Sequence, residues 1–90
     1  MIKTMVSVSG KDAVGIIAAV TTTLAEMNIN VLEINQTVLD GCFTMLMIVD
    51  IADSSADFSQ IQAALKQKGQ SMGMDVSMQR MDLFEAMHRI

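Results

Sequence analysis

The first thirty residues change from an alternating to a helical spacing of apolar positions. Between residues 2 and 9 one set of alternate positions is mostly apolar, namely Ile2, Thr4, Val6 and Val8. This period of two predicts a half-buried β-strand. Farther along, apolar residues fall three or four positions apart, at Ile17, Val20, Leu24 and Met27. That spacing predicts an amphipathic helix.

The next segment has the pattern of a β-hairpin. Asn28-Ile29-Asn30 ends the helix, and Val31–Leu39 alternates again, with Leu32, Ile34 and Val38 as its apolar set. Asp40-Gly41 predicts a type I′ turn, because both residues readily take positive φ values. The return strand, Cys42–Ile51, is apolar in both phases, which predicts a central strand covered on both sides. A two-residue turn would place three pairs on one core face: Val38 with Phe43, Gln36 with Met45, and Ile34 with Met47.

The remaining residues predict a helix, a fourth strand and a short terminal helix. Ser54-Ser55-Ala56-Asp57 supplies N-cap candidates for a helix whose apolar stripe is Phe58, Ile61 and Leu65. Gly69 or Gly73 is expected to end this helix. Asp75–Met81 reads as a strand with Val76 and Met78 on one face. Asp82-Leu83-Phe84-Glu85 resembles a capping box and predicts a last turn of helix that carries Phe84, Met87 and Ile90.

The order of these elements predicts an α+β fold of the ferredoxin-like βαββαβ type. Two right-handed βαβ crossovers with a hairpin between them give a four-stranded antiparallel sheet with both helices on one face. The other face would carry a mixture of apolar and polar residues, namely Met5, Cys42, Leu46 and Ile48 with Lys3, Asn35 and Thr37. Since this face is too apolar for water, we expect a partner to cover it and the protein to form a homodimer.

Composition narrows the class of protein further. The 90 residues are expected to form one domain, 1–90, with no linker, no apolar run long enough to span a bilayer and no signal peptide. A single cysteine, Cys42, excludes an internal disulfide and fits a cytoplasmic location. The net charge of −4 and the absence of Trp and Tyr argue against direct binding to nucleic acid or to a membrane surface.

The junction between the first strand and the first helix is the strongest candidate site. It consists of Gly10, Lys11, Asp12, Ala13, Val14, Gly15 and Ile16. Here free backbone N–H groups and the positive end of a helix dipole would point outward, which can hold a small anion or a carboxylate. The alternative is that the two glycines only form a tight turn, and spacing does not decide between them. The role of Asn30 is undecided in the same way: it either ends a turn or uses its side-chain amide to contact a ligand.

The residues do not support the other chemistries that this fold hosts. A copper chaperone needs Cys-x-x-Cys after the first strand, an acylphosphatase needs an arginine in that loop, and an RNA-binding domain needs aromatics on the central strands. No Ser/His/Asp set is present, because the single histidine, His88, lies at the end of the chain. We interpret Cys42 as a small buried apolar residue. The ten methionines are read as flexible packing residues or as part of an adaptable interface, rather than as Cu(I) ligands. No catalytic residue, metal site or cofactor is therefore expected.

Three passages of the sequence resemble the ACT domain family. They are residues 10–16, with the pattern Gly-x-Asp-x-x-Gly-Ile, then residues 24–31, then the hairpin of residues 36–45. The ending Phe84-Glu85-Ala86-Met87-His88-Arg89-Ile90 is similar to that of small stand-alone bacterial and archaeal ACT proteins, a subgroup of uncharacterised role related to the ACT halves of glycine cleavage system repressors.

The resemblance implies a regulatory module that binds an amino acid between two ACT domains. Backbone N–H groups of the first loop would meet the ligand, Asp12 would meet its ammonium group, and Asn30 of the partner would reach across. Many ACT loops have proline just before the second glycine, where this chain has Val14, so its loop is less rigid.

The function that we predict is non-enzymatic sensing of a small ligand by a homo-oligomer. The alternative is an ACT dimer that binds no ligand and docks on an enzyme or a transcription regulator. A metabolic enzyme is a more distant third reading.

Overall fold

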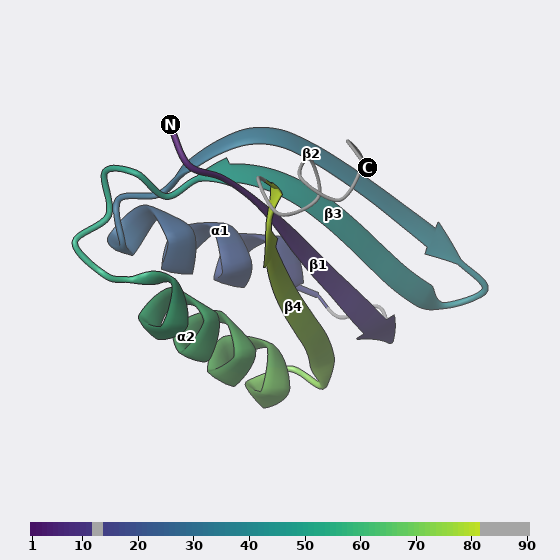
Figure 1. Cartoon of the computed structure of the whole chain (residues 1–90). Helices are drawn as coiled ribbons and strands as arrows, with labels where there is room; N and C mark the ends of the chain where they lie inside the picture. The colour runs from purple at the N-terminus through teal and green to yellow at the C-terminus, as the bar shows by residue number, and fades with distance from the viewer. Residues whose placement is uncertain (12–13, 82–90) are drawn as a thin grey trace.

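The computed structural model of the chain describes residues 1–11 and 14–81 (Figure 1). Its elements follow the order β1 (Lys3–Lys11), α1 (Ile16–Glu26), β2 (Asn30–Leu39), β3 (Cys42–Asp50), α2 (Phe58–Ser71) and β4 (Met74–Arg80). The predicted terminal helix, with its capping box at Asp82–Glu85 and the apolar residues Phe84, Met87 and Ile90, lies outside the described residues, as does His88.

The four strands form one antiparallel sheet in the order β2-β3-β1-β4. Both helices lie on the same face of this sheet (Figure 1). We call the helix-covered side the inner face and the other side the outer face. The predicted α+β, ferredoxin-like architecture is therefore confirmed.

The core lies between the inner face and the two helices. Alternate residues of β1 and β3 point into it and are almost fully buried, namely Thr4, Val6, Val8, Phe43, Met45, Met47 and Val49. The helices supply Ile16, Val20, Leu24, Ile61 and Leu65. The buried stripe of α1 thus begins at Ile16, whereas the spacing had pointed to Ile17, which is only partly buried. Met45, Met47, Met74 and Met78 are buried too, which confirms the packing role predicted for these methionines.

The hairpin has the predicted register, but fewer of its side chains are buried in the core than predicted. Asp40 and Gly41 have φ values of 53° and 76°, as a type I′ turn requires, and Val38 pairs with Phe43. Yet Val38 is 53% exposed and Ile34 is 48% exposed, although their partners on β3 are buried. Only one face of the central strand β3 is buried in the described residues. The prediction that both faces of this strand are covered is therefore wrong for the described residues.

A β-bulge interrupts β2 near its start. Val31 pairs with Val49 and Glu33 pairs with Ile48, so Leu32 is an extra residue between two neighbouring pairs. A bulge shifts the alternation of side chains and increases the local twist of the strand. The simple alternation predicted for Val31–Leu39 therefore holds only from Glu33 onward.

The end of α1 has a chemical cause that is visible in the sequence. Asn28 adopts φ 59°, and the N–H groups of Asn28 and Ile29 donate to the carbonyls of Ala25 and Leu24. This is a Schellman motif, in which asparagine takes the left-handed position that glycine usually occupies. The Asn28 side chain also donates to the Asp53 carbonyl, at 3.1 Å, which ties the helix end to the loop before α2.

The two ends of α2 follow different rules. Asp57 and Gln60 form a reciprocal capping box at its start, with both hydrogen bonds at 2.9 Å. Gly73, with φ +73°, lies just beyond the end of the helix. Of the two glycines that were predicted to end this helix, Gly73 is therefore the one that does so. Gly69 lies inside the helix instead. Glycine is required there because a Cβ would clash with Val76 Cγ2 on β4.

The buried hydroxyl of Thr4 gives a first prediction. Thr4 is fully buried, and its Oγ1 has no hydrogen-bond partner among the described residues. Thr4→Val keeps the shape and removes the unpaired polar atom, so the free energy of unfolding should rise by about 1–2 kcal/mol. Urea unfolding at constant m-value measures this change. The matched control is Thr44→Val on exposed Thr44, which should change stability by less than about 0.5 kcal/mol. Equal effects at both positions would contradict the assignment.

Candidate functional site

The predicted site at the β1–α1 junction has an open helix N-terminus at its centre. Gly15 is the N-cap of α1, with φ 86°, and among the described residues no side chain caps the helix or places an acid in its first turn. The first N–H groups of a helix have no acceptor within it, and they form the positive end of its dipole. Val14 and Gly15 are exposed, whereas Ile16 is buried in the core. The junction can therefore present N–H groups to a small anion.

The two glycines of the junction are required for different structural reasons. At Gly10 a Cβ would lie 2.7 Å from Met74 Sδ and 2.9 Å from the Gly73 carbonyl oxygen, so β1 and the start of β4 require a residue without a side chain there. At Gly15 no atom of the described residues, apart from its chain neighbours, lies within 4 Å of the corresponding Cβ position, so the need for glycine there comes from its left-handed backbone. Lys11 ends β1 with an exposed side chain. Asp12, the predicted contact for an ammonium group, lies outside the described residues.

Asn30 lies at the opposite end of the sheet from this junction. Asn30 pairs with Asp50, which also pairs with Lys3, whereas Lys11 at the other end of β1 pairs with Cys42. Eight residues along a strand span about 26 Å. Within one chain, the structure does not bring Asn30 to the glycine junction, so a contact between them requires a second subunit.

Asp50, which the sequence did not single out, has the most organised carboxylate of the described residues. Its Oδ1 accepts hydrogen bonds from the N–H groups of Ala52 and Ile2, both at 3.0 Å. These two bonds, that from Ala52 first, lower the pKa of the Asp50 carboxyl below its ordinary value of 3.8. An aspartate at the end of a largely apolar strand was the signal available in the sequence. Asp50 lies at the same end of the sheet as Asn30, with which it pairs.

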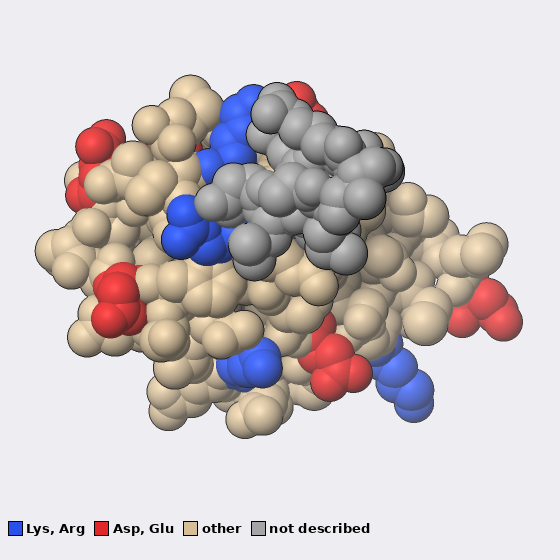
Figure 2. Space-filling view, viewed as in Figure 1, with Lys and Arg blue, Asp and Glu red and all other residues tan. Residues whose placement is uncertain are grey.

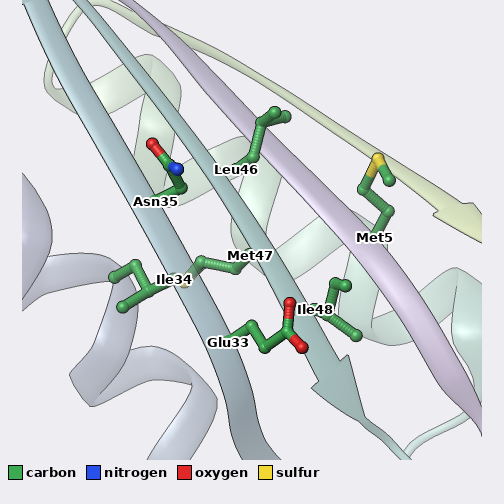
Figure 3. A pocket seen from close by; sticks show the side chains of 7 residues that line it. All are labelled: Met5, Glu33, Ile34, Asn35, Leu46, Met47 and Ile48. Atoms are coloured by element: carbon green, nitrogen blue, oxygen red, sulfur yellow. The ribbon is translucent and has the colours of Figure 1, made fainter.

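The outer face has a hollow that the sequence did not predict. It has a volume of about 440 Å³ and is lined by Met5, Glu33, Ile34, Asn35, Leu46, Met47 and Ile48 (Figure 3). Met5, Leu46 and Ile48 give it an apolar floor on β1 and β3, while Glu33 and Asn35 belong to the edge strand β2. The predicted sharing of one face by Met5, Leu46, Ile48 and Asn35 is confirmed by the register.

Cys42 differs from its prediction. It is exposed on the outer face at the hairpin end, as a free thiol, and not buried. The reason is that its neighbour Phe43 occupies the inner face, and alternation places Cys42 on the other side.

The surface is mixed in charge. On the face in Figure 2, separate basic and acidic groups lie on a surface that is mostly uncharged in the described residues. Among residues 1–11 and 14–81, no group of three or more His, Cys, Asp or Glu side chains converges to hold a metal ion. No helix in the same residues has the length and apolar character needed to cross a membrane.

The strand order and the two helices define a small α+β domain of the ferredoxin-like type, and comparison with known proteins identifies its family. The sequence profile of the ACT domain matches residues 4–79. This chain belongs to the ACT domain family.

Individual relatives narrow the group. The chain is 42% identical over 90 residues to a UPF0237 protein of Methanocaldococcus jannaschii, and the match covers 100% of both chains. It is similar to the solved structure of an ACT domain protein from Streptococcus pneumoniae, with a TM-score of 0.83, 36% identity, and 93% and 94% of the two chains covered. A protein described as a glycine cleavage system transcriptional repressor shares the fold, with a TM-score of 0.77 and 20% identity over 88% of this chain and 45% of that one.

The left-handed backbone of Gly15 gives the second prediction. Gly15→Ala should lower the free energy of unfolding by about 1–2 kcal/mol, because an L side chain is strained at this φ although space is open around it. Gly15→Asn is the matched control and should cost less, since asparagine tolerates the same backbone. Gly10→Ala should cost more than Gly15→Ala, because the side chain would clash with Met74 and Gly73. Denaturant midpoints rank the three variants, and a neutral Gly15→Ala would contradict the assignment.

Asp50 gives the third prediction, on pH. Since the folded state lowers the pKa of this carboxyl, its charged form stabilises the fold above the unfolded pKa, and this contribution disappears as pH falls through the folded pKa. The melting temperature of wild type should exceed that of Asp50→Asn at pH 7, and the two should converge as pH falls below about 4. Asp75→Asn removes one negative charge from another exposed strand position and should leave the melting temperature at pH 7 close to that of wild type. A pH-independent difference for Asp50→Asn would contradict the linkage.

Proposed function

We propose that this ACT domain is a non-enzymatic regulatory module that binds a small amino acid at the interface of a homodimer. The observation that carries the proposal is the uncapped N-terminus of α1 at an exposed glycine turn directly after β1. The ligand-binding residues are Gly10, Lys11, Asp12, Val14, Gly15 and Ile16 of one subunit, with Asn30 of the partner subunit. Membership of the ACT family and the chain-length match to stand-alone ACT proteins support it.

The chemistry of the junction suits the two charged groups of an amino acid. A ligand carboxylate would lie against the free N–H groups that follow Gly15, where the helix dipole favours a negative charge. Asp12 would repel a carboxylate but attract the ammonium group, so it orients the ligand. Gly10 acts indirectly in this scheme, because it allows β1 to lie close to Met74 just before the loop.

The opposite positions of Asn30 and the junction determine how two subunits must be arranged. If the β2 strands of two subunits pair in antiparallel orientation, the two sheets run in opposite directions. The partner's Asn30 then approaches the end of the first sheet at which the glycine junction lies. The β2 edge supports such pairing, because it exposes Ile34, Val38 and Leu39, of which Leu39 is 75% exposed. An exposed apolar edge strand is usually paired with another strand.

The exposed thiol of Cys42 supports a reducing environment, and we propose the cytoplasm as the location. In the alternative function the same β2 edge would join an enzyme or a transcription regulator directly, with no ligand bound. The exposed apolar residues of β2 are compatible with this second function as well.

Calorimetric titration with glycine, serine, and branched and aromatic amino acids tests the proposal. At least one should bind at or below millimolar concentration, and Asp12→Ala should weaken its binding about tenfold to a hundredfold. The reason is that a charge-assisted hydrogen bond contributes roughly 1.5–3 kcal/mol. Asp75→Ala removes the same charge at the other edge strand and should leave binding unchanged.

Two further measurements complete this test. Asn30→Ala should weaken binding less than Asp12→Ala, and only at concentrations where sedimentation equilibrium shows a dimer. If no amino acid binds to wild type at millimolar concentration while the dimer persists, sensing is wrong and the docking function replaces it. A monomer across the micromolar range would contradict both.

A further inference from the structure

The hollow on the outer face has an apolar floor of limited extent. Met5 pairs with Ile48 across β1 and β3, and Leu46, which is 46% exposed, lies two residues away on β3. Polar residues border this floor, namely Ser9, Thr37 and Thr44 toward the hairpin and Ser77 and Gln79 on β4. A stable protein–protein interface buries about 1,200–2,000 Å² in total, more than half of it apolar. Three partly exposed side chains supply a minor part of that area, so the floor has the extent of a small-molecule site.

Two polar side chains of β2 form one wall of the hollow. Glu33 pairs with Ile48 and Asn35 pairs with Leu46, so each lies on the outer face beside an apolar neighbour (Figure 3). Neither the Glu33 carboxylate nor the Asn35 side-chain amide has a hydrogen bond or an ion pair with another described residue. Both groups are therefore available to a ligand. The volume of about 440 Å³ falls within the range of ligand pockets, about 300–1,000 Å³.

The charge of this wall selects the kind of ligand. Glu33 is the one charged side chain among the described residues that line the hollow. The basic residue closest to it in the register of the sheet, Lys3, pairs with Asp50, the second residue after Ile48 on β3. A carboxylate at the edge of an apolar floor attracts a cation and repels an anion. The hollow therefore suits a ligand that is both cationic and apolar.

We propose that the hollow binds a small organic ammonium ion whose apolar body is an alkyl or aryl group. The ammonium group donates hydrogen bonds to the Glu33 carboxylate and to Oδ1 of Asn35. The apolar body lies on Ile48, Leu46 and Met5. Because neighbouring strands are about 4.8 Å apart, Ile48 is about 5 Å and Met5 about 10 Å from Glu33 across the sheet. A body of that length covers the floor while its ammonium group stays at the wall.

This site is separate from the glycine junction. Met5 precedes Lys11, at the end of β1, by six residues, which span about 20 Å. The hollow is also on the opposite face of the sheet from both helices (Figure 1). The proposal therefore does not depend on whether an amino acid binds at the junction.

Methyl NMR of the full chain tests the proposal, with phenethylammonium as the probe. The probe should bind saturably in the millimolar range and shift the methyl signals of Met5, Leu46 and Ile48, but not that of Ile61 in the core. Hydrocinnamate replaces the ammonium group by a carboxylate, and ethylammonium lacks the ring. Each should bind at least about threefold more weakly, because each loses one of the two contacts.

Variants separate the two contacts. Glu33→Gln keeps the shape of the wall but removes its charge, and it should weaken binding of phenethylammonium about two- to fivefold, as expected for an exposed ion pair. Leu46→Ser removes part of the floor and should weaken binding at least about threefold. Glu26→Gln, at the exposed end of α1, is the matched control and should leave binding unchanged.

Four results would overturn the proposal. Equal affinity for hydrocinnamate, or an unchanged affinity in Glu33→Gln, would mean that the wall does not select a cation. Shifts at Ile16 in place of Ile48 would mean that the probe binds at the glycine junction instead. An affinity that falls as protein concentration rises would mean that a second copy covers the hollow. The absence of any saturable shift would mean that the hollow holds no ligand of this class, and calorimetry with amino acids would still test the junction separately.

Discussion

One-sided burial of the antiparallel sheet is the constraint on which the rest of this structure depends. The inner face of β3 buries Phe43, Met45, Met47 and Val49 against two helices, whereas neither α1 nor α2 lies on its outer face. Because successive side chains of a strand alternate between faces, filling one face with large apolar residues decides what the other face must show. The exposure of Cys42 and the hollow above Ile48 both follow from this alternation.

Local chemistry made most of the fold predictable from the sequence. Asp40-Gly41 determined the turn, and the turn determined the register of the hairpin, down to the pairing of Val38 with Phe43. Asp57 was among the N-cap candidates for α2. The failures concern interactions between elements distant in sequence. The bulge at Leu32 and the contact of Gly69 with Val76 depend on how elements pack, which no local pattern records. The exposure of Ile34 and Val38 depends on how far the helices reach toward β2.

The candidate site was predictable only as far as the residues that form it locally. The glycines of the junction stood out from their spacing between a strand and a helix, but their different roles did not. Gly10 is explained by Met74, which lies 64 residues later in the sequence and against β1 in the structure. The role of Asn30 depends on a second subunit, because the two ends of one sheet never meet. Asp50 was overlooked because its hydrogen bonds come from backbone N–H groups, which a sequence does not show.

The bulge at Leu32 also limits how the edge of this sheet can grow. Edge strands with regular hydrogen-bonding groups along their whole length can pair in many registers, and this promiscuity leads to fibres. In β2 the ladder is regular only from Glu33 to Leu39, since the extra residue breaks it before that point. An added antiparallel strand from a second copy would then align the two regular stretches with each other, with the twofold axis near Gln36. The bulge would thus limit the number of registers in which a strand from a second copy could pair with this edge.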